Sequence, residues 1–139
     1  MLVNTFVNNI AWKRVSVRFD QIVSPESTQD IHENREGISI RELQELSARK
    51  EVVVLDVRLE EDRTHYGVKI PDTPWIEVHD IETALDQIPS DRPVVTYCVY
   101  GFWVSQDSAA ALRKKGVDAR YLEGGMAAWR AMGYSTESN

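Results

Sequence analysis

The sequence predicts an α/β fold in which helices flank both faces of an open parallel sheet. The main observation is that short runs of β-branched residues alternate along the chain with segments of helical periodicity. A second observation is that these runs are almost continuously apolar, which is typical of strands that are covered on both faces. The chain has 139 residues, which is the size of a single domain.

The first predicted helix begins next to Ser39 and leads into a buried strand. Ser39 and Glu42 have the spacing of a capping box, which satisfies free amides at a helix N-terminus. Three apolar residues at helical spacing would form its packing face: Ile40, Leu43 and Leu46. The run over residues 52–57 then predicts a strand that is buried on both faces.

A second strand is predicted over residues 94–97, directly after Pro93. Between the two strands, the acidic run at residues 60–62 predicts the start of a helix, because carboxylates are favourable at the positive end of a helix dipole. Residues 81–88 predict a further helix, which Pro89 would end.

The C-terminal third of the chain predicts a helix over residues 105–115, with Ser105 as its N-cap and Gly116 as its C-terminal stop. We expect Trp129 to anchor the last helix in the core. The remaining elements are expected in this order: a strand over 119–122, a tight turn at 124–125 and a short helix over 126–132.

The N-terminal part is expected to differ from the rest. Residues 1–36 read as an N-terminal extension or arm, and residues 37–139 as the folded domain. Residues 24–37 are polar and contain turn formers, whereas the alternation over residues 14–19 predicts a strand. The extension is compatible with a dimerisation arm or with a docked strand, so a homodimer is one alternative.

Composition disfavours several classes of function. Sixteen Lys and Arg residues against 22 Asp and Glu residues give a net charge of −6, whereas nucleic-acid binding needs a basic face. No apolar run approaches the ~20 residues that span a bilayer, so no membrane role is expected. One cysteine and three scattered histidines predict no metal site, no cofactor and no internal disulfide. A single unpaired thiol and the lack of a convincing export signal favour the cytoplasm.

The residues most suited to chemistry cluster around the single cysteine. Cys98 directly follows one predicted strand, and Asp56 and Arg58 lie at the end of the other. Because the carboxyl ends of parallel strands meet at one edge of a sheet, we expect these groups to lie close together. Cys98 is either an inert core thiol or a nucleophile, and its place between a strand, a loop containing Gly101 and a helix favours the nucleophile. Inward-facing amides of such a loop would stabilise a thiolate.

Several segments, in this order along the chain, resemble the rhodanese (sulfurtransferase) domain over roughly residues 37–133. The loop is particularly similar to that of rhodanese-like proteins associated with chromate-resistance genes. The segments that carry the resemblance are Leu55-Asp56-Val57-Arg58, Cys98-Val99-Tyr100-Gly101, then Ser105, Ala109 and Leu112, and finally Leu122-Glu123-Gly124-Gly125 with Trp129.

This resemblance implies that Cys98 is a nucleophile that takes sulfane sulfur from thiosulfate or a persulfide donor and passes it to a thiophilic acceptor. The donor and the acceptor would each be a small molecule or a protein. The acceptor would be a separate molecule, because the chain has no second cysteine that could resolve the persulfide. Asp56, Arg58 and Ser105 would support the loop; for Asp56 and Arg58, an ordinary surface ion pair is the alternative. The amides that would cradle the persulfide belong to Val99, Tyr100, Gly101, Phe102, Trp103 and Val104.

The loop also departs from the family pattern. It is one residue longer than the usual sulfurtransferase loop, as in related phosphatases and arsenate reductases. Those enzymes carry an arginine where this chain has Val104, so an arsenate-reductase-like or phosphatase activity is disfavoured.

No basic side chain lies in the loop, so any cation would come from neighbouring residues. Phe102 and Trp103 either pack on the sheet edge or form an exposed contact patch. This composition suits a hydrophobic or protein-borne sulfur donor, and it keeps open a non-catalytic protein-binding module. The candidate neighbouring cations are Arg58, Arg63, His65 and His79.

Overall fold

The computed structural model describes residues 36–139, which form a parallel sheet with helices on both sides. The predicted strand over residues 14–19 lies outside the described residues. All strand pairs in the central sheet are parallel, as the sequence predicts. From one edge to the other, the strands are β1 (Gly37–Ile38), β5 (Ala119–Leu122), β4 (Val94–Tyr97) and β2 (Val53–Asp56).

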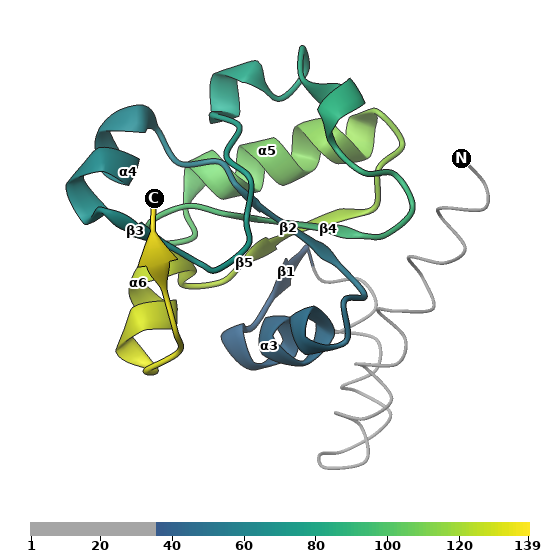
Figure 1. Cartoon of the computed structure of the whole chain (residues 1–139). Coiled ribbons are helices and arrows are strands. Elements are labelled where there is room, and N and C mark those ends of the chain that lie inside the picture. Colours follow the sequence, from purple (N-terminus) through teal and green to yellow (C-terminus); the bar gives the residue numbers. More distant parts are fainter. Residues whose placement is uncertain (1–35) are drawn as a thin grey trace.

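Helices cover the two faces of this sheet and divide the core into two clusters. Helices α3 (Ile40–Ala48) and α6 (Gly125–Ala131) lie on one face, and α5 (Trp103–Lys114) lies on the other (Figure 1). One cluster joins Leu43 and Trp129 to the α3 and α6 face of the sheet. The second cluster joins Leu112 of α5 to the opposite face. Burial on both faces explains why β2 and β4 consist of buried residues throughout.

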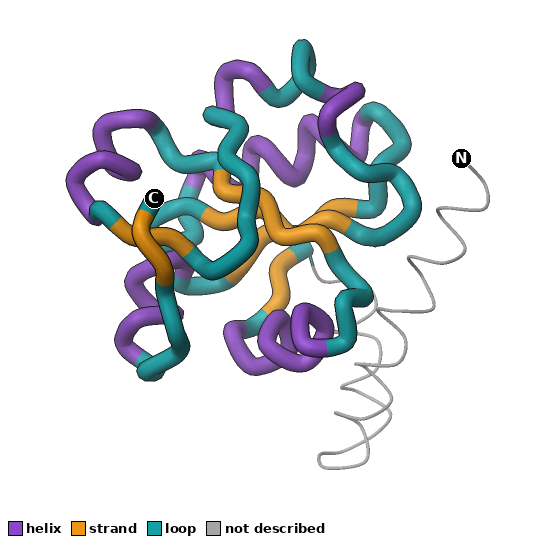
Figure 2. The backbone as a smooth tube through the Cα atoms, viewed as in Figure 1, coloured by secondary structure: helices purple, strands orange, loops and turns teal. Residues whose placement is uncertain are grey.

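Smaller elements surround the sheet. Strands β3 and β6 form a separate antiparallel pair, which brings the C-terminus beside α4 (Figure 2). The bounds of the smaller elements are α4 (Glu60–Tyr66), β3 (Val68–Lys69), the 3-10 segments η1 (Val78–Asp80) and η2 (Leu85–Gln87), and β6 (Glu137–Ser138).

Local signals at helix ends are confirmed. The Ser39 amide donates to Glu42 Oε1 at 2.9 Å, and the Glu42 amide donates to Ser39 Oγ at 3.1 Å, which completes the capping box. Gly116 has φ of 88° and ends α5, with its amide donating to Arg113 O and the Val117 amide donating to Leu112 O. Helix α4 begins at the predicted acidic run.

Two predictions about helices are wrong. Residues 81–88 form turns and the short segment η2, not an α-helix; the Thr83 hydroxyl donates to Asp80 O, a local bond of the kind that competes with helix formation. Helix α5 begins at Trp103, so Ser105 lies inside its first turn and is not the N-cap. The earlier start follows from Gly101, whose φ of 79° reverses the chain before the helix.

None of the helices within residues 36–139 is both long and apolar enough to cross a bilayer.

Candidate active site

Cys98 follows β4 at the carboxyl edge of the sheet, and its side chain faces α5. It shares this face with Val94 and Thr96, because side chains alternate along a strand. The thiol Sγ donates a hydrogen bond to Ser105 Oγ at 3.2 Å. The residue is buried, with 5% of its surface exposed, and it packs in the core cluster beneath α5. Burial fits the inert thiol, so the position of the sulfur relative to α5 decides which chemistry is open to it.

The sulfur lies at the N-terminal end of α5. The Gln106 amide donates to Phe102 O at 3.1 Å, and this is the first hydrogen bond of the helix. The amides of residues 103–105 therefore have no acceptor inside the helix. Ser105, which contacts Sγ, belongs to this first turn. The N-terminal end of α5, which is the positive end of its helix dipole, therefore lies beside Sγ.

The first turn of α6 is hydrogen-bonded to the cysteine loop. The Met126 amide donates to Cys98 O at 2.8 Å, and the Ala127 amide donates to Val99 O at 2.9 Å. From the other side, Gln106 Nε2 donates to Gly101 O at 2.9 Å. Two carbonyls of the loop are thus directed toward α6. The sequence analysis did not single out Gln106, which joins the loop to α5.

Close approach between the loop and α6 requires glycine. A Cβ on Gly125 would lie 2.5 Å from Cys98 O and 2.7 Å from Val99 O. A Cβ on Gly101 would lie 2.7 Å from Gly124 N. All of these neighbours are backbone atoms, which cannot rotate away as a flexible side chain does. The glycine pair that the sequence assigns to a tight turn therefore also sets the distance between α6 and the cysteine loop.

Asp56 and Arg58 form a buried ion pair at the end of β2, so the surface ion pair considered in the sequence analysis is wrong. Both side chains are fully buried. Arg58 Nε and Nη2 donate to the two oxygens of Asp56 at 2.9 and 2.7 Å. Burial alone would lower the pKa of Arg58, but the hydrogen bonds and the negative charge of Asp56 raise it. The positive charge of the Arg58 guanidinium is therefore paired with Asp56 and does not face the loop.

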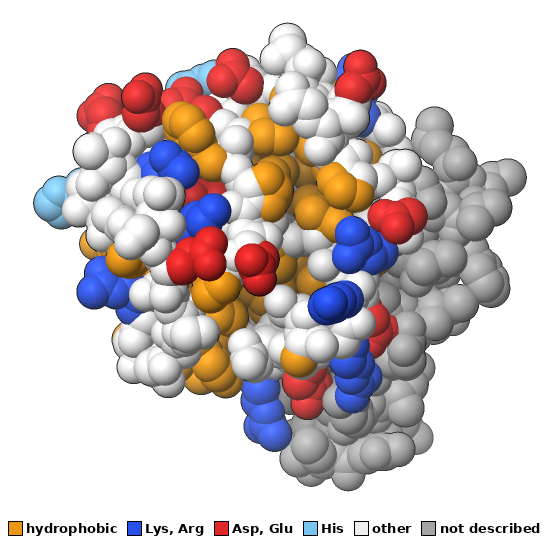
Figure 3. Space-filling model, viewed as in Figure 1, with side chains coloured by type: hydrophobic (Ala, Val, Ile, Leu, Met, Phe, Trp, Pro, Cys, Tyr) orange, Lys and Arg blue, Asp and Glu red, His pale blue; other side chains and the backbone are white. Residues whose placement is uncertain are grey.

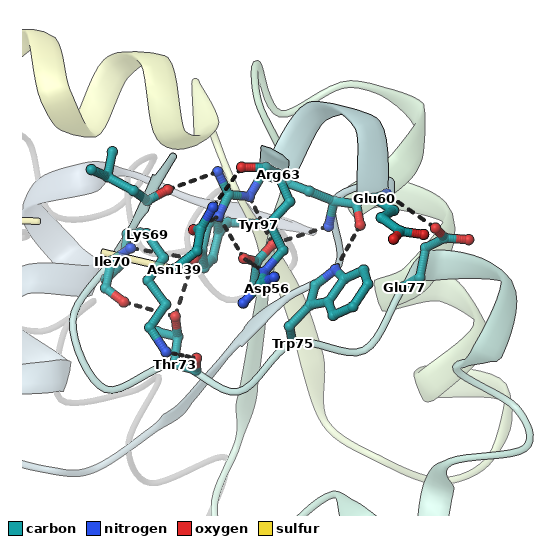
Figure 4. A network of polar contacts seen from close by, with 12 residues as sticks. Asp56, Glu60, Arg63, Lys69, Ile70, Thr73, Trp75, Glu77, Tyr97 and Asn139 are labelled. Atoms are coloured by element: carbon teal, nitrogen blue, oxygen red, sulfur yellow. Dashed lines mark hydrogen bonds and ion pairs between the residues drawn. The ribbon is translucent and has the colours of Figure 1, made fainter. Parts of the chain in front are cut away.

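The pair belongs to a wider polar network (Figure 4). Arg58 Nη1 donates to Val68 O at 3.0 Å, and Nη2 contacts Asn139 Oδ1 at 3.3 Å. The Trp75 indole donates to Arg58 O at 2.8 Å. Nothing in the sequence pattern indicates the role of Asn139, which reaches this network across 81 positions of the chain.

Tyr97 connects the same region to the cysteine. Its hydroxyl contacts Thr73 Oγ1 at 3.1 Å and accepts a hydrogen bond from the Ile70 amide at 3.3 Å. Its ring lies under the Arg58 guanidinium, with 5.6 Å from Cζ to the ring centre. Burial, together with the charge of Asp56, raises the pKa of Tyr97, so the phenol stays protonated.

The structure also shows the surroundings of the other three candidate cations, Arg63, His79 and His65. Arg63 lies over the Trp75 ring, 4.6 Å from its centre. His79 contacts Glu77 at 3.0 Å, and this hydrogen bond lowers the pKa of Glu77. His65 lines a pocket beside the loop. His65 therefore lines this pocket together with Val99 and Tyr100 of the loop.

The aromatic residues of the loop are exposed. Phe102 and Trp103 have 66% and 54% of their surface in solvent, so of the two alternatives the exposed patch is correct. Tyr100 is also exposed, and its ring centre lies 6.0 Å from that of Phe102. Val104, at the position where an oxyanion-binding arginine would stand, is buried in the core cluster under α5. This position supplies no charge to the loop.

Comparison with known proteins identifies a family with this fold. The rhodanese-like domain model matches residues 39–132, more than half of the chain. A rhodanese-like domain protein from Staphylococcus aureus is 27% identical, with 75% of this chain and 98% of that chain covered and a TM-score of 0.63. Comparison with curated proteins gives no match.

Two further solved structures show the same fold at lower identity. A rhodanese-related protein from Thermoplasma volcanium is 23% identical, with 73% of this chain and 96% of that chain covered and a TM-score of 0.64. A thiosulfate sulfurtransferase from Pseudomonas aeruginosa is 23% identical with a TM-score of 0.66; the match covers 75% of this chain but only 19% of that one.

Proposed function

The chain belongs to the rhodanese-like domain family, and from that premise we propose that it is a sulfurtransferase that carries sulfane sulfur on Cys98. The observation that carries this proposal is the place of Sγ, 3.2 Å from Ser105 Oγ in the first turn of α5. A sulfur at the positive end of a helix is suited to react as a thiolate.

The first half of the reaction loads the cysteine. The Cys98 thiolate attacks the outer sulfur of the donor, and the S–S bond of the donor breaks as the new S–S bond forms. With thiosulfate, the products are a Cys98 persulfide anion and sulfite. The Ser105 hydroxyl, which accepts from the thiol, would turn to donate to the sulfur once the proton has left. The free amides of residues 103–105 would hold the charge on the outer sulfur.

The second half of the reaction unloads the persulfide. An acceptor thiolate attacks the outer sulfur and takes it, and the Cys98 thiolate leaves unchanged. Sulfur is transferred without an external oxidant or reductant. Since the chain has one cysteine, the acceptor is a separate molecule.

The donor is proposed to be hydrophobic or bound to a protein. No cationic side chain is found among the loop residues Val99, Tyr100, Phe102, Trp103 and Val104. The charge of the neighbouring Arg58 is neutralised by Asp56. A small dianion would gain little from such a surface, whereas exposed aromatic side chains stabilise contact with an apolar or protein-borne donor.

Intact-mass measurement after incubation with thiosulfate or with an organic persulfide tests the activity. We expect a species one sulfur atom heavier, which cyanide removes and Cys98→Ser abolishes. The matched control is Cys98→Ser combined with Ser90→Cys, because position 90 is exposed and lies in a loop. Its thiol should take up no sulfur from thiosulfate. Equal labelling of both thiols would show that the site does not activate Cys98.

A non-catalytic protein-binding module is the second candidate. It is favoured by the combination of a buried thiol with an exposed aromatic loop. In that case neither donor increases the mass of the protein, and Phe102→Ser weakens capture of the partner while Cys98→Ser does not.

A further inference from the structure

The outer edge of β2 is covered only at its carboxyl end. β2 lies at one edge of the central sheet, with β4 on its inner side. On the outer side, the Asp56 amide donates to Pro74 O at 3.0 Å, and the Ile76 amide donates to Asp56 O at 2.9 Å. These two bonds form a single parallel bridge between Asp56 and Trp75. Residues 74–76 therefore pair with one residue of β2 and no more.

The next two bonds of this ladder would belong to Val54, and the sequence prevents both. The Val53 amide donates toward the β4 side at 2.8 Å, so the main chain of Val54 faces outward, as that of Asp56 does. The next donor to the Val54 carbonyl would be Pro74, which has no amide hydrogen. The next acceptor for the Val54 amide would be Asp72, whose φ of 60° breaks the extended chain. Within residues 36–139, no hydrogen bond on this outer side involves the main chain of Val54.

A pocket of about 440 Å³ opens over this unpaired edge, and its lining includes residues 52–54 and 71–74. The side chains of Val52 and Val54 pack in the cluster on the α3 and α6 face, and that of Val53 packs under α5, so the strand presents its main chain at the edge. A recessed edge admits a single extended chain but hinders the approach of a whole sheet from a second copy. Three prolines line the pocket, and none has an amide hydrogen that could pair with the edge: Pro71, Pro74 and Pro89.

The charges of this pocket favour an acidic occupant. Lys50 and Arg92 line it with one carboxylate, that of Asp72, although the whole chain has a net charge of −6. Arg92 lies 3.4 Å from Asp91, whereas within residues 36–139 no ion pair involves Lys50. Basic side chains gather right of centre in the space-filling view, over the segment that leads into β2 (Figure 3). A carboxylate beside Lys50 would therefore gain a charge-assisted hydrogen bond.

We propose that the open edge of β2 binds an extended peptide segment of a partner protein, with an acidic side chain of that segment beside Lys50. The peptide adds a strand to the sheet: one of its carbonyls accepts from the Val54 amide, and one of its amides donates to the Val54 carbonyl. This added strand is short, because residues 74–76 already occupy the edge at Asp56. The docking site goes beyond the proposed function and does not depend on the chemistry of Cys98.

Hydrogen exchange of the full chain, followed by NMR, tests whether the edge is open. We expect the Val54 amide to exchange at least about tenfold faster than the amides of Val53 and Asp56, which are both hydrogen-bonded. A Val54 amide that exchanges as slowly as these two would overturn the proposal, because the edge would already be occupied by residues 1–35 or by a second copy.

Titration with the peptide acetyl-Thr-Val-Glu-Val-Thr-amide tests the occupant. We expect shifts of the Val52 and Val54 amide signals and slower exchange of the Val54 amide. The same peptide with lysine in place of glutamate should bind about tenfold more weakly, the effect of one charge-assisted hydrogen bond. Lys50→Gln should remove this preference, and Lys114→Gln, an exposed lysine outside the pocket, should keep it. Equal affinity of the two peptides, or no shift at Val52 and Val54, would overturn the proposal.

Two N-methylated forms of the glutamate peptide separate strand addition from side-chain contact. One is methylated at both valines and the other at the glutamate, and a strand directs alternate amides to opposite edges. One form should therefore lose binding while the other keeps it, and equal affinities would overturn strand addition.

Pro74→Ala tests the gap in the ladder, because the new amide can donate to the Val54 carbonyl in place of the peptide. It should weaken peptide binding about fivefold, the effect of one neutral hydrogen bond. Pro89→Ala, at a pocket proline outside the ladder, should not, and equal effects of the two changes would contradict the assignment. No residue of the cysteine loop lines the pocket, so Lys50→Gln should load sulfur on Cys98 as the wild type does. Failure of peptide binding would then leave the proposed function standing, and failure of sulfur loading would leave the docking site standing.

Discussion

Replacement of Gly125 by alanine tests whether close packing of α6 against the cysteine loop builds the site. Gly125 has φ of 58°, and an added Cβ would lie 2.5 Å from Cys98 O, 2.7 Å from Val99 O and 2.8 Å from Gly101 N. All three are backbone atoms, so relief requires α6 to move away from the loop. That movement stretches the hydrogen bonds from the Met126 and Ala127 amides to the loop carbonyls.

The expected loss of stability in Gly125→Ala is the sum of the backbone strain and the lost hydrogen bonds. A left-handed conformation costs an alanine about 1–2 kcal/mol. Loss of two backbone hydrogen bonds adds about 0.5–1.5 kcal/mol each. Gly125→Ala should therefore lower the free energy of unfolding by about 2–5 kcal/mol. Gly133→Ala is the matched control, because Gly133 has φ of 82° at the other end of α6 with nothing within 4 Å of an added Cβ. It should cost about 1–2 kcal/mol.

Urea unfolding of the full chain measures both variants, and the rate of persulfide formation is measured on the same samples. We expect Gly125→Ala to lose more stability than Gly133→Ala and to react more slowly, while Gly133→Ala keeps the wild-type rate. Equal losses of stability in the two variants would refute the steric argument. A normal rate in a destabilised Gly125→Ala protein would show that the position of α6 does not set the reactivity of the sulfur.

Three further predictions concern the residues around the sulfur. Asp56→Asn leaves the Arg58 charge buried without its counter-charge and should cost about 3–5 kcal/mol in urea unfolding, whereas Asp56→Leu combined with Arg58→Met should recover much of that loss; a cost below 1 kcal/mol for the single change would contradict the buried pair. Tyr97 keeps its proton when folded, whereas an unfolded tyrosine ionises near pH 10, so stability present below about pH 10 is lost as pH rises toward the higher folded pKa. Tyr97→Phe should flatten the decline in stability between pH 9 and 11 measured by urea unfolding, by at most about 1.4 kcal/mol per pH unit, and unchanged slopes would argue against this account. Ser105→Ala removes the hydroxyl at 3.2 Å from the sulfur and should slow persulfide formation about tenfold, since hydrogen bonds to charged groups are worth about 1.5–3 kcal/mol; Ser108→Ala, an equally buried serine of α5 that donates to Val104 O, should react at the wild-type rate.

The elements that sequence predicts best are those whose signals are local. The strand over residues 94–97 has the predicted bounds, because its β-branched run is buried throughout. The strand over residues 119–122 also has the predicted bounds, although its two central residues are only partly buried. The capping box at Ser39 and the stop at Gly116 depend on residues within one turn of each other. The helix predicted over residues 81–88 failed because its periodicity is carried by three buried apolar residues that a chain of turns also buries: Ile81, Ala84 and Ile88.

The candidate site was predictable in its position but not in its contacts. Strand order and the rule for parallel sheets bring Asp56 and Cys98 to one edge, and the structure has them at the ends of neighbouring strands. Whether Asp56 meets solvent or Arg58 depends on what covers the edge, and that cover includes Asn139 at the end of the chain. Pairing over such a sequence distance leaves no periodic trace. The pocket beside the loop, which Arg130 also lines, is equally invisible, because it forms where three separate elements meet.

The position of the sulfur is fixed by the two residues before it, one on each face of the sheet. Thr96 Oγ1 donates to Ser105 O at 2.8 Å, which holds the first turn of α5 over the strand. On the opposite face, Tyr97 is held by Thr73 and lies under the buried Arg58 guanidinium. We infer that Arg58 would act on the cysteine through the placement of β4, because its charge is paired with Asp56. The partial positive charge beside the sulfur belongs to the N-terminal end of the α5 dipole. Under the proposed function, the ion pair would position β4, and the α5 dipole would supply the field for a persulfide anion in a loop without a basic residue.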